Sequence, residues 1–144
     1  MRFKKLLVAV DFSEASRKAL QAGAAMAADT GVPLVLLHVV SPPRAHAEGA
    51  MFPVGDTPAG AEAELAAWKR DAEATGARLV TTRIVAGTPW HEIVEVLRAD
   101  RSFDLAIVGT HGRTGLTHVL LGSVAERVVR FAPCPVLVVR VPDY

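Results

Sequence analysis

Short apolar runs alternate with helix-like segments along the chain, and this alternation restricts the fold more than any other feature. Continuous apolar runs are typical of strands buried on both faces of a parallel sheet. Five such strands are predicted, at 5–10, 33–40, 78–85, 103–108 and 135–141. Helices are predicted at 14–29, 62–75, 89–99 and from 119 or 123 to 131. This order predicts an α/β fold with a parallel sheet, right-handed crossovers and helices on both faces.

The ends of the predicted helices carry recognisable signals. Ser13 is placed to cap the first helix, and Gly31 to end it. Gly76 is placed to end the second helix. Thr88 is the predicted cap of the third helix, with Pro89 in its first turn. The third strand mixes polar and apolar residues, which favours a position at the edge of the sheet.

Composition excludes several classes of protein. The 144 residues, 51% of them hydrophobic, fit one domain over 1–144 with a substantial core. The net charge is +1 and no Lys/Arg cluster stands out, so nucleic-acid binding is not predicted. Apolar runs are too short to span a membrane, and the first one meets Asp11 without a cleavage site. With Cys134 as the single cysteine, a cytoplasmic protein without internal disulfides is expected.

The segment 41–60 interrupts the alternation. It holds four prolines and three glycines and shows no sustained periodicity. We expect a flexible loop within the domain. Two interpretations stay open, since loops of this length are either disordered or act as lids over a ligand.

A glycine-rich stretch follows the fourth predicted strand. Gly109, Gly112, Gly115 and Gly122 precede Ser123, which opens a helical pattern. In open α/β sheets, ligands bind beyond the carboxyl ends of the strands. Glycines there let an anion approach backbone amides, and the first amides of a helix point at negative groups. Phosphate binding is therefore one interpretation. The other is that the glycines form ordinary turns and that Ser123 only caps the helix.

Better-known phosphate motifs are absent from the sequence. There is no GxxxxGK[ST], so the chain is not a P-loop NTPase. The first strand is followed by DFSE and not by GxGxxG, which argues against a dinucleotide-binding domain.

Four stretches carry a resemblance to a known family: KKLLVAVDFSEAS, VLLHVV, GTPWHEIV and GTHGRTGLTHVLLGSVAERVVRFAPCPVLVV. The chain resembles the universal stress protein family along nearly its whole length. The last stretch matches the signature G-x2-G-x9-G-[ST] of the ATP-binding members, at Gly109, Gly112, Gly122 and Ser123. The resemblance implies a single-domain, Rossmann-like fold of the adenine nucleotide alpha hydrolase-like kind, with strand order 3-2-1-4-5.

The resemblance also implies a role for each matching residue. Asp11 would contact ribose or a metal-bound phosphate, and the backbone of Val39 would meet the adenine edge. Gly109 and Gly112 would line the ribose and phosphates. The β- and γ-phosphates would lie at the start of the last helix, and Mg²⁺ would accompany ATP. The implied ATP-binding set is Ala9, Val10, Asp11, Val39, Gly109, Thr110, His111, Gly112, Arg113, Gly122, Ser123 and Val124. Ala9 departs from the proline that some ATP-binding members have there.

Several residues have simpler interpretations. Asp11 could be an acid that favours the helix dipole, and this alternative stays open. The histidines lack the spacing of a metal site, and His38 is expected in the core or at its rim. Trp68 and Trp90 are expected to pack on helices. Cys134 is expected to be a small residue that enters the last strand. No catalytic residue is assigned.

Three functions remain as hypotheses. The first is an ATP-binding module in stress regulation that hydrolyses ATP slowly or not at all. The second is an ATP-hydrolysing or nucleotidyl-transferring enzyme of the same architecture, for which the sequence offers no evident general base. The third is an oligomerisation protein with a vestigial pocket. A homodimer is also predicted, through antiparallel pairing of the apolar edge strand Val136–Val141 with its copy.

Overall fold

The predicted alternation of strands and helices is confirmed. The structure is a computed structural model that describes residues 2–41, 57–110 and 121–141. Its elements are β1 Leu6–Ala9, α1 Glu14–Thr30, β2 Leu34–Val40, α2 Pro58–Thr75, β3 Val80–Ala86, α3 Pro89–Ala99, β4 Leu105–Gly109, α4 Ser123–Phe131 and β5 Val136–Val139. All strand pairs are parallel, and the order is β3-β2-β1-β4-β5, as the family resemblance implied.

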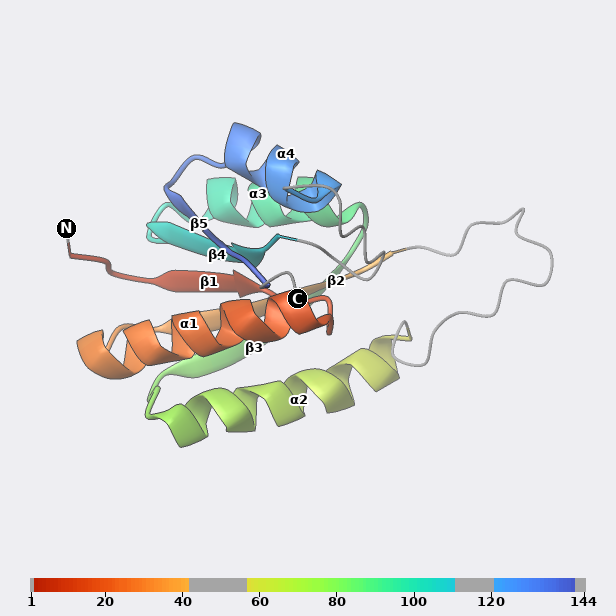
Figure 1. Ribbon diagram of the computed structural model, residues 1–144. Helices are drawn as coiled ribbons and strands as arrows, with labels where there is room; N and C mark the ends of the chain where they lie inside the picture. Colours follow the sequence, from red (N-terminus) through yellow and green to blue (C-terminus); the bar gives the residue numbers. More distant parts are fainter. Residues whose placement is uncertain (1, 42–56, 111–120, 142–144) are drawn as a thin grey trace.

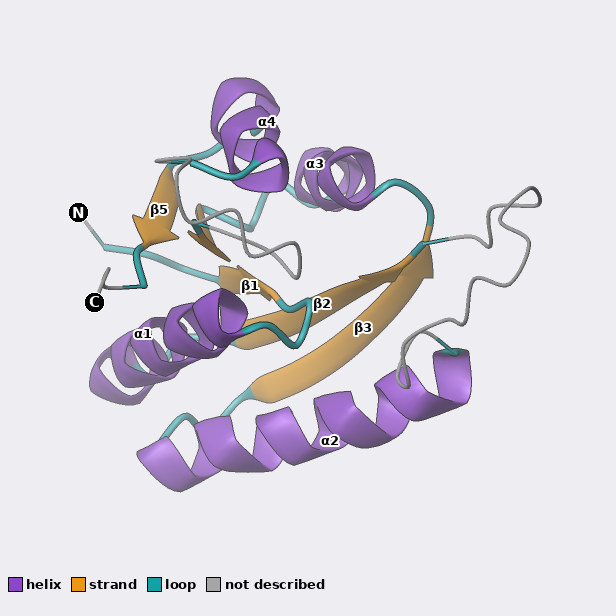
Figure 2. Cartoon of the chain, turned by 45° about the vertical axis from the view of Figure 1, so that its right-hand side comes forward, coloured by secondary structure: helices purple, strands orange, loops and turns teal. Residues whose placement is uncertain are grey.

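The helices cover both faces of the sheet (Figure 1). α1 and α2 lie on one face, and α3 and α4 lie on the other. Figure 2 shows the same two layers after a turn of the molecule. Because side chains of a strand alternate between faces, the central strand β1 contributes to both cores. Leu6 and Val8 pack under α1 and α2, whereas Leu7 packs under α3 and α4, and all three are fully buried.

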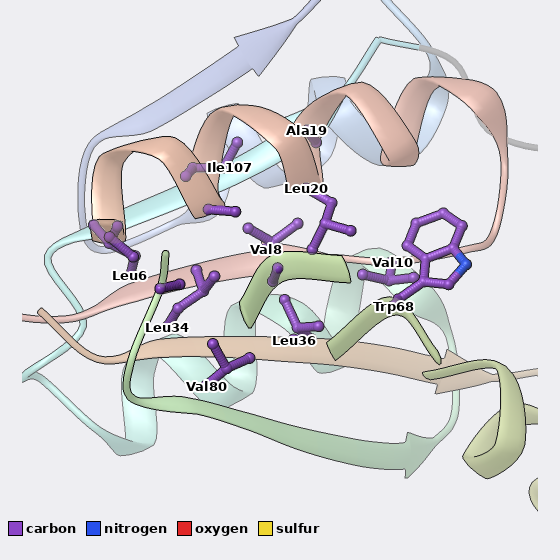
Figure 3. Packing of buried hydrophobic residues seen from close by; sticks show 14 of the residues in the cluster. Leu6, Val8, Val10, Ala19, Leu20, Leu34, Leu36, Trp68, Val80 and Ile107 are labelled. Atoms are coloured by element: carbon purple, nitrogen blue, oxygen red, sulfur yellow. The ribbon is translucent and has the colours of Figure 1, made fainter. Parts of the chain in front are cut away.

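The core between the sheet and the first pair of helices is shown in Figure 3. Leu34 and Leu36 of β2 join Val8 of β1 there, and Leu20 of α1 closes the layer from above. Trp68 of α2 lies beside Val10, toward the carboxyl end of β1. Trp68 is 7% exposed, which confirms that this residue packs in the core.

Two glycines end helices in the way their position predicted. Gly31 and Gly76 follow α1 and α2 with φ of 75° and 116°. Glycine adopts this left-handed conformation without the steric clash that a Cβ would cause.

The loop in the segment 41–60 is shorter than predicted. Residues 58–60 belong to α2, which begins four residues before the predicted start at 62. The side chain of Thr57 accepts a hydrogen bond from Gly60 N at 3.1 Å, and Pro58 occupies the first turn. Residues 42–56 lie outside the described part, so the flexibility of the loop stays a prediction.

Both edge strands have exposed side chains. In β3, residues 81–83 are exposed, in agreement with the edge position predicted from their polarity. β5 is shorter than the predicted strand at 135–141, and its Leu137 is 39% exposed.

No helix in the described ranges is long and apolar enough to cross a membrane.

Candidate functional site

The direction of the connections changes between β1 and β4, which are neighbouring strands of the sheet. Leu6, Leu7 and Val8 of β1 pair with the β4 residues from Leu105 to Ile107. Beyond the sheet, the chain turns from β1 into α1 on one face, whereas the next helix after β4 is α4 on the other face. Such a switch in the direction of the connections is where ligands bind in open α/β sheets.

The end of β4 packs closely against the start of α1. A Cβ added to Gly109 would lie 2.6 Å from the carbonyl carbon of Ala15 and 2.7 Å from its oxygen. Ordinary carbon contacts are about 3.5–4.0 Å. Gly109 is therefore needed for packing, independently of any ligand.

Thr110 connects the end of β4 with the neighbouring elements. Its N–H donates to the oxygen of Val139 at 3.0 Å, and its own carbonyl accepts from Gly122 N at 2.5 Å. The side chain is 3% exposed, and its Oγ1 has no hydrogen-bond partner within the described part of the chain. The sequence prediction grouped Gly109, Thr110 and Gly122, and the structure brings them together.

The start of α4 does not fit the alternative in which Ser123 caps the helix. Gly122 is the N-cap residue, so Ser123 is the first residue of the helix and its side chain is exposed. Within the part of the chain that the structure describes, no side chain forms a cap bond at this helix end. Thr88 occupies the predicted N-cap position of α3, but its side chain forms no cap bond there. By contrast, Ser13 caps α1 through its Oγ, which accepts from Ser16 N at 3.1 Å.

Asp11 lies in the turn between β1 and α1 and is half-buried. Its Oδ1 accepts hydrogen bonds from Ser13 N at 2.9 Å and from Ser13 Oγ. Its backbone N–H donates to Ser16 Oγ at 3.3 Å. The carboxylate therefore has a local role at the start of α1, close to the helix-start alternative. Its role toward a ligand stays a prediction.

Phe12, which follows Asp11 in this turn, carries no functional signal in the sequence. Phe12 has φ of 65°, the left-handed conformation. A phenylalanine in a DFSE stretch gives no signal for this conformation, since Asn and Gly are the residues expected there.

The remaining predicted residues flank the same edge. Ala9 and Val39 are partly buried against the core of α3 and α4, as is Val124. Val10 is buried on the opposite side, and its N–H donates to Leu37 O at 2.8 Å. His111, Gly112 and Arg113 lie outside the described residues, so their predicted contacts with phosphate are not placed.

Two residues outside the predicted site behave as expected for packing. Trp90 lies 5.4 Å from Phe131, ring centre to ring centre, on the side of α3 and α4. Cys134 is half-buried beside β5, and burial raises the pKa of its thiol. A protonated thiol is a poor nucleophile, which favours the packing role.

The described residues contain no group of three or more His, Cys, Asp or Glu side chains that could hold a metal ion. Mg²⁺ is commonly bound through nucleotide phosphates and one or two carboxylates, and not by a cage of protein ligands alone. Asp11 at the ligand edge fits a contribution of this kind.

The sequence model of the universal stress protein family matches residues 2–140. The chain belongs to the universal stress protein family. Among curated universal stress proteins, MJ0531 of Methanocaldococcus jannaschii is 49% identical over 74 residues, which is 51% of this chain and 42% of that relative. A putative universal stress protein of Staphylococcus epidermidis is 31% identical over 144 residues, covering 98% of this chain and 86% of the relative.

A solved structure extends the likeness to a ligand complex. A universal stress protein in complex with cAMP has 27% identity to this universal stress protein and a TM-score of 0.72. The alignment covers 96% of this chain and 98% of that one. Within the family, at least one protein of similar fold is therefore known with an adenine nucleotide bound.

Proposed function

We propose that this universal stress protein binds an adenine nucleotide, ATP with Mg²⁺, with the phosphates at the start of α4. The observation that carries the proposal is the N-terminus of that helix, whose N-cap residue Gly122 lies beside Thr110 at the switch point of the sheet. Among the described residues no side chain caps it, which favours binding of an anion by the helix amides that follow Gly122.

Two further findings support this proposal. The spacing of Gly109, Gly112, Gly122 and Ser123 matches the signature that marks ATP-binding members of the family. The related universal stress protein in complex with cAMP carries an adenine nucleotide on a similar fold. We assign the β- and γ-phosphates to the start of α4 at Gly122 and Ser123. The proposed donors are the Ser123 hydroxyl and the helix amides after Gly122, because the Gly122 N–H already donates to Thr110 O.

The other contacts of the proposed complex follow the ends of the strands. The ribose or a metal-bound phosphate meets Asp11, and the adenine edge meets the backbone of Val39 between the ends of β1 and β2. Ala9 and Val10 form the wall on the β1 side. Thr110 and Val124 complete the site on the side of β4 and α4, with His111, Gly112 and Arg113 between them in sequence.

Replacement of Gly122 tests the placement of the phosphates. Gly122→Val adds a branched side chain where the backbone is proposed to meet phosphate, and Gly122→Ala adds a single methyl group. We expect Mg·ATP affinity, measured by calorimetry, to fall more for valine than for alanine. Melting of the nucleotide-free proteins controls for folding. Wild-type affinity in a folded Gly122→Val protein would place the phosphates elsewhere.

We further propose a regulatory role, in which binding matters more than hydrolysis. An enzyme that hydrolyses ATP or transfers a nucleotidyl group is the alternative. Phosphate release from ATP distinguishes the two. Multiple turnovers by wild-type protein that are lost in Gly122→Val would support the enzyme. Binding without turnover would support the regulatory role.

We also propose that two copies pair through β5. This strand is at the edge of the sheet, its Leu137 is exposed, and Val136, Val138 and Val139 are only partly buried. An apolar edge strand tends to pair with another strand. A two-fold axis beside β5 would pair it antiparallel with its own copy.

A further inference from the structure

The turn after β1 contains a conformation that needs support from its surroundings. Phe12 has φ of 65°, and it is the one non-glycine residue with a positive φ in the described ranges. An L-residue in this region brings its Cβ close to a carbonyl oxygen. A bulky residue keeps such a conformation only where surrounding contacts hold it. The contacts of the Phe12 ring are therefore expected to hold the turn in this conformation.

Three rings from separate elements meet beneath this turn. The Phe12 ring lies 4.6 Å from that of His38 in β2 and 5.3 Å from that of Trp68 in α2, the latter edge-on at 85°. Both separations are in the range in which aromatic pairs attract. The Arg17 guanidinium covers the Trp68 ring at 3.9 Å and pairs with Asp71 at 2.6 Å. The half-buried Phe12 ring thus packs against β2 and α2, and Arg17 of α1 covers the Trp68 ring of this cluster.

His38 holds the backbone on the other side of Asp11. Its ring is 2% exposed, and Nδ1 lies 2.6 Å from the carbonyl oxygen of Val10. A carbonyl only accepts hydrogen bonds, so Nδ1 carries the proton and donates it. His38 therefore ties the end of β1 to β2 at the residue before Asp11, where the chain leaves the sheet.

The orientation of the Asp11 carboxylate depends on both of these supports. Asp11 stands between Val10, which His38 holds, and Phe12, which the ring cluster holds. The same turn presents Ser13, whose Oγ caps α1. A shift of the backbone on either side of Asp11 would move the carboxylate and the start of α1 together.

We propose that His38 and Phe12 are positioning residues of the nucleotide site. The His38 hydrogen bond and the ring cluster fix the turn, so that Asp11 faces the ligand edge of the sheet before the nucleotide arrives. This inference rests on the proposed binding of an adenine nucleotide. If the rings served only as core packing, an apolar side chain of similar size at position 38 would leave the affinity per folded molecule unchanged.

A pair of substitutions at His38 separates the hydrogen bond from the packing. His38→Asn keeps a donor, because the side-chain amide nitrogen of asparagine occupies the same branch on Cγ as Nδ1. His38→Leu keeps an apolar side chain of useful volume and removes the donor. We expect Mg·ATP affinity per folded molecule to fall about tenfold for His38→Leu and to stay within about threefold for His38→Asn.

A second measurement reports on the stability of the turn in the nucleotide-free protein. Hydrogen exchange of the Ser13 and Ser16 amides in the nucleotide-free protein reports how firmly the turn is held. We expect faster exchange at these amides in His38→Leu and in Phe12→Gly, relative to amides in β4 of the same variant. In His38→Asn, exchange at Ser13 and Ser16 should stay close to the wild-type rate.

The outcomes decide the inference and the proposed function separately. Equal ATP affinities of His38→Leu and His38→Asn, in a wild type that binds ATP, would overturn the positioning role and leave the proposed function standing. A wild type that binds no adenine nucleotide would remove the proposed function and, with it, the role toward a ligand. Exchange at Ser13 and Ser16 that is the same in both His38 variants would overturn the support of the turn itself.

Discussion

The close approach of Gly109 to Ala15 gives a quantitative prediction for the nucleotide-free protein. Gly109→Ala would place a Cβ 2.6 Å from the carbonyl carbon of Ala15 and 2.7 Å from its oxygen and Cβ. To bring this Cβ to an ordinary contact distance of about 3.5 Å, Ala15 or position 109 has to shift by about 1 Å. Two of the three obstructing atoms are backbone, so the whole start of α1 has to move away from β4.

The expected loss of stability in Gly109→Ala is the difference between two opposing contributions. Overpacking costs typically 1–3 kcal/mol, and we take about 3 kcal/mol because backbone obstructs the new methyl group. Alanine also restricts the unfolded chain, which offsets about 0.4–1 kcal/mol. The net loss is about 2 kcal/mol in the free energy of unfolding. With an unfolding entropy of about 2.1 cal/mol/K per residue, this lowers the Tm by about 7 °C.

Urea denaturation of nucleotide-free Gly109→Ala measures this loss directly. If Gly109 serves only the ligand, the substitution leaves stability unchanged or raises it, since alanine restricts the unfolded chain. An unchanged or higher midpoint would therefore refute the packing argument. Ala15→Gly provides a control. It removes one of the three obstructing atoms, so the double variant should regain only part of the lost stability.

Three further predictions use the same kind of reasoning. A Cβ at Gly23 would meet side-chain atoms, Val8 Cγ2 at 2.6 Å among them, so Val8→Ala should reduce the destabilisation caused by Gly23→Ala, with a coupling of about 1 kcal/mol in a double-mutant cycle. The hydrogen bond from Lys5 Nζ holds the pKa of Asp100 well below its usual range, so Lys5→Ala should raise that pKa in an NMR titration of the carboxyl carbon. A carboxyl group whose pKa is lower in the folded than in the unfolded protein stabilises the fold at pH values above its unfolded pKa of about 4. This stabilisation is lost as the pH falls through the folded pKa. The difference in unfolding free energy between wild type and Lys5→Ala should therefore be full above about pH 5 and shrink in stronger acid. Leu137→Lys should shift the mass seen by light scattering from a dimer toward the chain mass of 15.3 kDa, and an unchanged dimer would argue against pairing through β5.

The type and order of the elements could be predicted from sequence because their signals are local. Buried parallel strands are continuous apolar runs, and Ser13 and Gly31 mark the ends of α1. The sequence predictions were wrong mainly about where helices and strands begin and end. Thr57 and Pro58 open α2 with the same Thr-Pro pair that was recognised at α3, but composition favoured a loop. The strand order came from the family resemblance, since apolar runs do not say which strands are neighbours.

The site was predicted as a set of residues and not as a set of contacts. Gly109 was assigned to the ligand, whereas its contact with Ala15 depends on how α1 lies on the sheet. The bond from His38 to the Val10 carbonyl requires β1 and β2 to be neighbours in one register. Neither relation has a signal in the local sequence. The left-handed conformation of Phe12 also depends on distant rings, so residue type alone argued against it.

The strand order has a consequence for how the protein is made on the ribosome. β1 is the first strand of this sheet to be synthesised, but it lies at the centre of the sheet and needs β4 as its second neighbour. At about 5–20 residues per second, synthesis from the end of β2 at Val40 to the start of β4 at Leu105 takes roughly 3–13 s. During this interval the nascent chain has no β4 to cover the apolar strand Leu6–Ala9. An unpaired apolar edge attracts other strands. Chains that stop before Leu105 should therefore aggregate or recruit chaperones, whereas chains that extend past Gly109 can close the sheet around β1.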